Sequence, residues 1–162
     1  MKSIQFSLVF ISAILLVNCS PSKKISGNYT HEVECMGSEL DGSITLKTWG
    51  KGKNRADALE QARKEAINAV LFIGIRNGKP DCDSRPILNA PNIRENQADY
   101  FSTFFKDEGA YKKFVSGKDE SFGKKERVQG RDGEVMFGFI VRVLRSDLKK
   151  QMISDEILNI EK

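Results

Sequence analysis

This 162-residue chain has little histidine, little cysteine and no strong excess of either charge. Its single histidine, His31, excludes a metal cluster with several histidine ligands, and its three cysteines lack the paired spacing of a zinc site. His31 and Cys35 would point the same way on one strand, but about 13 Å apart, which is too far for a base and its nucleophile. We therefore expect no catalytic residue, no metal and no cofactor, and a hydrolase is a minor alternative.

The balance of charge also limits the class of partner. Lysine and arginine total 26 against 22 aspartate and glutamate, which gives a formal net charge of +4. Proteins that bind nucleic acid normally carry a clustered basic face and a markedly basic domain. We expect a mildly basic solvated surface and no nucleic-acid partner.

The sequence has no apolar run as long as a transmembrane helix, which needs about 20 such residues. The run FSLVFISAILLV at 6–17 follows Lys2 and is typical of a secretory signal peptide. It ends at Leu16-Val17-Asn18-Cys19, which resembles the bacterial lipoprotein box, with Asn18 where that family usually has Gly, Ala or Ser. The resemblance implies a signal peptide at 1–18, a lipidated Cys19 and a tether at 19–29. The alternative is an ordinary signal peptide that happens to contain a cysteine.

The residues after Cys19 bear on its location. In lipoproteins of this kind a serine after the cysteine generally directs the protein to the outer membrane, and nearby acidic residues favour surface display, as in the Bacteroidetes. Here Ser20 is followed by Lys23 and Lys24, with no acidic residue nearby. The resemblance implies an outer-membrane lipoprotein that faces the periplasm, with the membrane as a partner through its lipid anchor.

Two cysteines, Cys35 and Cys82, remain once Cys19 is lipidated. Because exported proteins meet an oxidising compartment, we expect a disulfide between them. It would close a loop of about 48 residues and stabilise the fold by ~4 kcal/mol at most. The alternative is two separate thiols, with Cys35 buried on one strand face.

Periodicity predicts one α+β domain over 30–162, a two-layer sandwich after the signal helix. We expect an antiparallel sheet of about four strands against two or three helices. Alternating segments at 30–36 and 43–49 predict a hairpin. A second hairpin is expected around the turn at 130–133, with a basic edge strand at 121–129 and a central strand at 134–144 that is apolar on both faces.

Three helices are expected. The first begins near Asn54, its cap, and ends near Gly74. The second covers 92–105 and the third begins near Ser146. The apolar face of the first helix comprises Leu59, Ala62, Ala66, Ala69, Val70 and Ile73.

The stretch TWGKGKNRADALEQARKEA at 48–66 runs from two glycines into the first helix. A mononucleotide loop would need a hydroxyl after its lysine and a dinucleotide loop a third glycine, so the stretch does not favour nucleotide binding. It resembles the pattern G-x-G-x-(S/N)-x-x-(E/D)-A-x-x-x-A-(R/x)-x-x-A of FlgT-type N-terminal domains and related small envelope lipoproteins. The matching residues are Gly50, Gly52, Asn54, Asp57, Ala58, Ala62, Arg63 and Ala66. The resemblance covers about thirty residues and implies a binding or scaffolding module.

The expected function is therefore a lipid-anchored envelope accessory or scaffold protein with an unidentified envelope protein as its partner. The alternative is a periplasmic lipoprotein that binds peptidoglycan or another small or polymeric ligand. For that alternative Trp49, next to Lys47 and Lys51, is the candidate surface. A deep pocket with convergent polar groups would favour ligand binding or hydrolysis, and a flat aromatic patch would favour protein contact.

An aromatic helix edge is the second candidate surface. Tyr100, Phe101, Phe104 and Phe105 would occupy an arc of roughly 140° on the second helix, wider than a sheet contact requires. Tyr100 and Phe105 could therefore contact a protein partner. The other interpretation is that Tyr111 and Phe114 fold back and bury this edge.

Overall fold

The computed structural model describes residues 32–121, 127–129 and 135–158. The expected signal peptide, lipidation of Cys19, tether and 130–133 turn lie outside the described residues, as does His31. Within the described part, no helix is both long and apolar enough to cross a membrane.

A mixed sheet forms one layer of the domain, with strand order β3-β1-β2-β6-β4 and β5 also paired to β6. Its strands are β1 (Glu34–Ser38), β2 (Ile44–Gly52), β3 (Asn77–Gly78), β4 (Val115–Ser121), β5 (Arg127–Gln129) and β6 (Val135–Val143). Antiparallel pairs join β1, β2, β6 and β4, as expected, and the two-residue β3 adds a parallel pair with β1.

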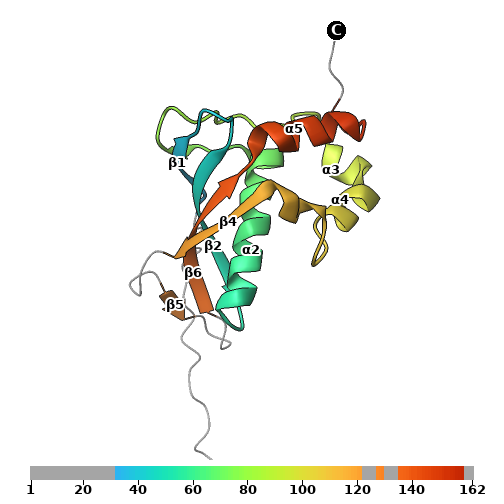
Figure 1. Ribbon diagram of the computed structural model, residues 1–162. Helices are drawn as coiled ribbons and strands as arrows, with labels where there is room; N and C mark the ends of the chain where they lie inside the picture. The colour runs from blue at the N-terminus through green and yellow to red at the C-terminus, as the bar shows by residue number, and fades with distance from the viewer. Residues whose placement is uncertain (1–31, 122–126, 130–134, 159–162) are drawn as a thin grey trace, which may run out of the picture. The chain divides into compact units, whose positions relative to one another are not determined.

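The helices lie on one side of this sheet (Figure 1). They are α2 (Arg55–Asn68), the π-helix η2 (Ala69–Ile73), α3 (Ile93–Asn96), α4 (Ala98–Phe104), the 3-10 helix η3 (Ala110–Phe114) and α5 (Arg145–Ser154). The expected α+β class, with a sheet packed against helices, is confirmed.

The two glycines before α2 let the helix lie directly on β2. A Cβ atom on Gly50 would be 1.7 Å from the carbonyl oxygen of Ala58 and 2.8 Å from the backbone nitrogen of Ala62. A Cβ on Gly52 would be 2.6 Å from the nitrogen of Ala58. Ala58, Ala62 and Ala66 are fully buried, so small residues face each other across this contact. The glycines therefore serve packing.

Asn54 caps α2, as predicted. Its side-chain oxygen accepts hydrogen bonds from the N–H groups of Ala56 and Asp57, at 2.8 and 3.0 Å. These are N–H groups that a bound anion would need at a helix start. The cap therefore competes directly with an anion at this position.

One residue of the predicted α2 face is placed wrongly by the sequence pattern, because Ile73 is 55% exposed. The last turn is a π-helix in which the N–H of Gly74 bonds the carbonyl of Ala69 at 2.8 Å. A π turn holds more residues than an α turn, so the apolar face rotates. Leu71 is fully buried instead.

The expected single helix at 92–105 is also wrong, because it is broken into α3 and α4 at Gln97, whose φ and ψ are −117° and 35°. α3 is held to the end of α2, where Arg94 donates to Asn68 at 3.0 Å and lies 5.3 Å from the ring centre of Phe72. α4 is held by the buried Phe101, whose ring also contacts Phe72, with the ring centres 4.9 Å apart. Residues on both sides of the break therefore pack on Phe72.

β6 is a central strand between β2 and β4, as predicted. Of the basic edge strand expected at 121–129, the structure describes β5 at Arg127–Gln129, and the edge strand β4 lies earlier, at Val115–Ser121. The first strand is likewise displaced, since β1 covers Glu34–Ser38 where 30–36 was expected. A register shift between Cys35 and Gly37 marks a bulge in β1.

The expected disulfide is confirmed. Cys35 on β1 is bonded to Cys82 in the loop after β3, with the two Cα atoms 6.3 Å apart. Cys35 is 2% exposed, so the bond joins that loop to the buried face of the sheet.

Candidate functional site

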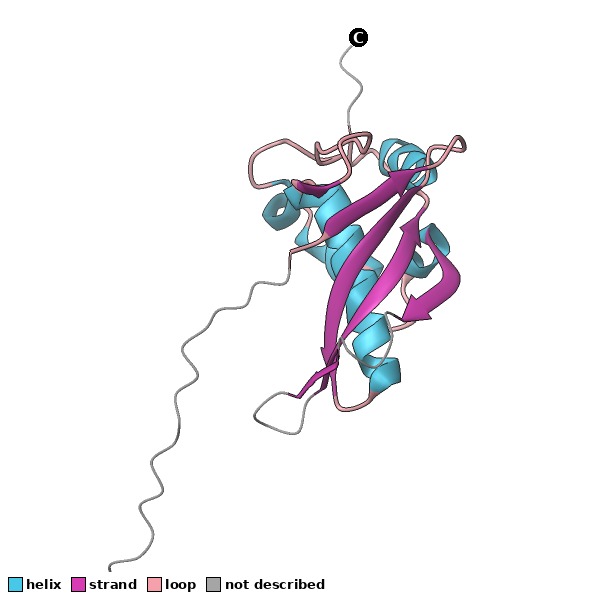
Figure 2. Cartoon of the chain, turned by 90° about the vertical axis from the view of Figure 1, so that its left-hand side faces the viewer, coloured by secondary structure: helices cyan, strands magenta, loops and turns pink. Residues whose placement is uncertain are grey.

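The four residues proposed as a binding surface fall into two groups. Trp49 and Lys51 belong to β2, and they alternate with Thr48 and Gly50, which are buried on the α2 side. They therefore point to the outer face of the sheet, which is turned toward the viewer in Figure 2 with the helices behind it. Tyr100 belongs to α4, on the helical side.

On the outer face, Trp49 is half-buried and lies opposite Gly138 in the β2–β6 register. The Lys47 ammonium is 5.6 Å from the centre of the Trp49 ring, a distance at which a cation and an aromatic face attract each other. Lys51 is exposed and lies opposite Met136. Trp49 and Lys51 form a surface patch on this face. The hollows described below lie elsewhere, beside α4.

Aromatic side chains hold α4 to the domain. Phe101 and Phe104 are both 3% exposed, and Phe104 stacks on Phe114 with ring centres 6.1 Å apart. Phe105 is half-buried and stacks on Tyr111, also at 6.1 Å. Of the two interpretations of this edge, the structure shows the one in which Tyr111 and Phe114 fold back against it.

The segment after α4 is fastened to α2 by ion pairs. Lys64 contacts Asp107 at 2.7 Å, and Lys112 contacts Glu60 at 3.1 Å. The hydroxyl of Tyr111 also donates to Glu60. Lys64 holds the pKa of the Asp107 carboxyl below its ordinary value by hydrogen bonding and by charge. Although exposed pairs are weak singly, together they hold this segment in one place.

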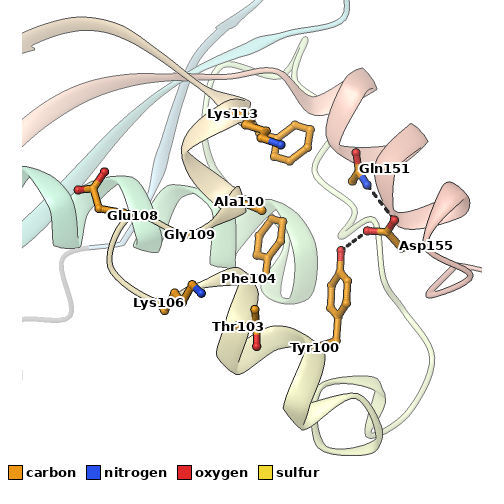
Figure 3. A pocket seen from close by; sticks show the side chains of 11 residues that line it. Tyr100, Thr103, Phe104, Lys106, Glu108, Gly109, Ala110, Lys113, Gln151 and Asp155 are labelled. Carbon is orange, nitrogen blue, oxygen red and sulfur yellow. Dashed lines mark hydrogen bonds between the residues drawn. The ribbon is translucent and has the colours of Figure 1, made fainter.

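A cleft of about 600 Å³ opens between α4, η3 and α5, and it is the feature of the described chain that we consider the candidate site (Figure 3). We call it the α4–α5 cleft. It is lined by Tyr100, Thr103, Phe104, Lys106, Glu108, Gly109, Ala110, Lys113, Phe114, Gln151 and Asp155.

Gly109 shapes the loop wall of this cleft. A Cβ atom there would be 2.4 Å from the carbonyl oxygen of Phe104 and 2.7 Å from that of Lys106. The chain can therefore turn closely over the end of α4 only with glycine at this position. This turn brings η3 back against α4 and forms one side of the cleft.

The opposite wall carries a bonded group of three polar side chains. The Tyr100 hydroxyl donates to one oxygen of Asp155 at 2.6 Å, and the Gln151 amide donates to the other at 2.8 Å. Burial, and then the hydrogen bond and charge of Asp155, raise the pKa of Tyr100 well above its ordinary value. Tyr100 therefore stays protonated at neutral pH, and each oxygen of Asp155 already accepts a hydrogen bond.

The lining of the α4–α5 cleft carries charges of both signs. Lys106 and Lys113 are exposed, and neither has an ion pair within the described ranges. Figure 3 shows them on either side of the Phe104 ring. The acidic residues of the lining are Glu108 and Asp155. Glu108 pairs at 2.5 Å with Lys112, which also pairs with Glu60.

Phe105 contributes to a second, smaller hollow on the other flank of α4. This hollow has a volume of about 390 Å³ and is also lined by Arg94, Glu95, Ala98, Phe101 and Ser102. Tyr100 and Phe105 therefore lie beside different hollows, with α4 between them.

The sequence pattern pointed to Tyr100 and the neighbouring aromatic residues but not to most of the cleft. Gln151 and Asp155 belong to α5, about fifty residues further along the chain, and nothing in the sequence links them to Tyr100. The i,i+4 spacing of Tyr100 and Phe104 was the one available signal, since it places both on one helix face. Lys106 and Lys113 follow from no pattern that we recognise.

Comparison of the chain with protein-family models, with curated proteins and with solved structures found no match. The resemblance to FlgT-type domains and envelope lipoproteins therefore stays a prediction. Among the residues that the structure describes, no group of histidine, cysteine, aspartate and glutamate could hold a metal ion.

Proposed function

We propose that this chain is a lipid-anchored accessory or scaffold protein of the bacterial envelope, and that it contacts a protein partner in the periplasm through the α4–α5 cleft. The observation that carries the proposal is the composition of this cleft. Small exposed parts of the stacked and largely buried Phe104 and Phe114 lie at its base, and its rim is polar. Protein contact sites combine an apolar centre with a polar rim in the same way.

The envelope location rests on two observations of different kinds. The lipoprotein box at 16–19 resembles an anchoring signal. The Cys35–Cys82 disulfide is of the kind that persists in oxidising compartments such as the bacterial periplasm. Together they support an exported domain tethered through Cys19 and facing the periplasm.

The polar wall of the cleft favours binding over hydrolysis. A general base must be available to take a proton from the reacting group. Asp155 already accepts bonds on both oxygens, and the raised pKa of Tyr100 makes its hydroxyl a poor nucleophile. These groups are therefore better suited to hold a bound surface than to transfer protons.

A second candidate function is binding of a small or polymeric envelope ligand, such as a peptidoglycan fragment. The polar wall and the cleft volume of about 600 Å³ both favour it, since a pocket with polar groups was the feature expected for ligand binding and small-molecule sites measure about 300–1,000 Å³. It shares the envelope location and differs only in the class of ligand.

Chemical crosslinking in native membranes, followed by mass spectrometry, tests the main proposal. The full-length chain is compared with Thr103→Trp, which fills the mouth of the α4–α5 cleft, and with Ser102→Trp as a matched control. Both residues are exposed and adjacent on α4, but Ser102 lines the smaller hollow. We expect a specific protein adduct with the wild type and the control, and its loss with Thr103→Trp. Adducts that survive Thr103→Trp, or no protein adduct at all, would contradict the proposal.

A further inference from the structure

Resting on the proposed role of the α4–α5 cleft as a contact site, the charges of its lining point to the chemistry of what it binds. We infer that the cleft binds a zwitterionic group, with its ammonium at Asp155 and its carboxylate at the unpaired lysines Lys106 and Lys113. Two sources share this chemistry: a segment of the protein partner with neighbouring charges of opposite sign, and a free amino acid or short peptide.

One acidic residue of the lining already has counter-ions. Glu108 is 2.5 Å from Lys112, which is also 3.1 Å from Glu60. Arg63 lies 3.7 Å from Glu60 and completes a set of two carboxylates and two cations. Because this set contains as many cations as carboxylates, the other three charged residues of the lining determine which ligand charges fit the cleft.

Asp155 is an acidic residue of the lining whose charge is not compensated. Its two oxygens accept hydrogen bonds from Tyr100 at 2.6 Å and from Gln151 at 2.8 Å, and both donors are neutral groups. No cation pairs with Asp155 in the part of the chain that the structure describes. The two hydrogen bonds hold the half-buried carboxylate in one orientation, and its negative charge remains for a ligand cation.

The groups around Asp155 suit an ammonium, which has three N–H donors. A carboxylate has about four acceptor positions, of which Asp155 uses two. The oxygen of the Gln151 amide accepts no hydrogen bond within the described chain, and the Tyr100 hydroxyl can accept one while it donates. These three acceptor groups lie together on one wall of the cleft (Figure 3).

Lys106 and Lys113 supply the opposite charge. Both are exposed, and neither has an ion pair in the described ranges. Lys106 follows α4 and Lys113 belongs to η3, whereas Asp155 follows α5, so the two signs of charge belong to different walls. An ammonium donates strong hydrogen bonds to a carboxylate, and a ligand carboxylate can therefore replace the water at either lysine.

Charges of both signs select against a ligand that carries only one. A simple cation would be attracted by Asp155 but repelled by the two lysines, and a simple anion would meet the reverse. A zwitterionic group places each of its charges beside an opposite one. Phe104 and Phe114 are only 3% and 6% exposed, so apolar contact contributes little to the choice.

The test measures the binding of ω-amino acids to the full-length chain in detergent. These probes carry an ammonium and a carboxylate at opposite ends of an unbranched chain, and a series of increasing length finds the charge separation that fits the cleft. The alkylamine and the alkanoate of matching length are controls with one charge each. We expect the best ω-amino acid to bind at least about tenfold more tightly than either control, because a hydrogen bond to a charged group contributes at least that factor.

Two measurements report this binding. Isothermal titration calorimetry gives the affinities. Chemical shifts of Thr103, Gly109 and Ala110 should change with the best ω-amino acid, since all three residues line the cleft.

Variants that remove one charge locate each end of the ligand. Asp155→Asn should weaken binding of the best ω-amino acid about tenfold and strengthen binding of the alkanoate, because a repulsive charge is removed. The double variant Lys106→Gln with Lys113→Gln should weaken it by a similar factor and strengthen binding of the alkylamine. Lys149→Gln is the control, because Lys149 is exposed on α5 but does not line the cleft. Melting temperatures verify folding, and the lysine variants, at exposed positions, decide the test if Asp155→Asn does not fold.

Three results would overturn the inference: no binding of any ω-amino acid at millimolar concentration, equal binding by one of the singly charged controls, or equal binding by the double lysine variant and the wild type. Each of them removes the evidence that the cleft recognises both charges together.

Crosslinking in native membranes separates the sources of the ligand and the two proposals. Loss of the protein adduct on addition of the best ω-amino acid assigns the zwitterionic group to the protein partner. Binding of the ω-amino acid without any protein adduct assigns the group to a free ligand and contradicts the proposed protein contact. If adducts depend on Thr103 while no ω-amino acid binds, the protein-binding function stands and the zwitterionic chemistry is wrong.

Discussion

Replacing Gly50 with alanine tests whether α2 must lie directly against β2 for the fold to be stable. The new Cβ would be 1.7 Å from the Ala58 carbonyl oxygen, and ordinary contact begins at 3.4 Å. The atoms that the new Cβ would meet belong to the backbone of α2 and not to a flexible side chain. The helix backbone must therefore move by about 1.7 Å, which is the difference between the two distances. Overpacked cores typically lose about 1–3 kcal/mol, and backbone contact places this variant at the upper end.

We expect Gly50→Ala to lower the free energy of unfolding by about 3 kcal/mol and the melting temperature by about 10 °C. Thermal unfolding followed by circular dichroism measures the change. The control is Lys51→Ala at the adjacent exposed position, which should alter the free energy by no more than about 0.5 kcal/mol. If Gly50→Ala melts with the wild type, or if Lys51→Ala is the more damaging change, the glycines have a role other than packing.

Three further predictions concern anchoring, the disulfide and the polar wall. Cys19→Ser should move the chain from the membrane fraction to the soluble fraction, and firm retention in the membrane would refute the lipid anchor. Thiol labelling of denatured, unreduced protein should find neither Cys35 nor Cys82 free, and Cys82→Ala should lower the free energy of unfolding by about 2–4 kcal/mol. Tyr100→Phe removes the hydrogen bond to Asp155 and should cost about 1 kcal/mol at neutral pH. Because the pKa of Tyr100 is raised in the folded chain, the stability that Tyr100 contributes is complete below its ordinary pKa of 10.0 and is lost as the pH rises above that value. The free energy of unfolding of Tyr100→Phe should therefore fall less steeply above about pH 10 than that of the wild type.

Much of the fold follows from local patterns. The cap at Asn54, the alanine face of α2 and the central position of β6 are each determined by residues near one another in the chain, and each was predicted. The exposure of Ile73 was not, because a π turn changes the angle per residue without a local signal. The break at Gln97 lies between Arg94 and Phe101, both of which make tertiary contacts with Phe72.

The candidate site was less predictable than the fold for the same reason. Tyr100 and Phe104 could be placed on one helix face from their spacing. The carboxylate that holds Tyr100 lies 55 residues away, at Asp155. The position of Lys113 depends on the turn at Gly109, where the close approach to Phe104 becomes visible only in three dimensions.

A photo-crosslinking residue at position 103 of the full-length, lipidated chain in native membranes tests the central claim most directly. Thr103 is exposed and lines the α4–α5 cleft, whereas Lys51 is exposed on the outer face of the sheet and provides the comparison site. The account predicts one dominant protein adduct from position 103 and none from position 51. A protein adduct from position 51 with none from position 103 would contradict it.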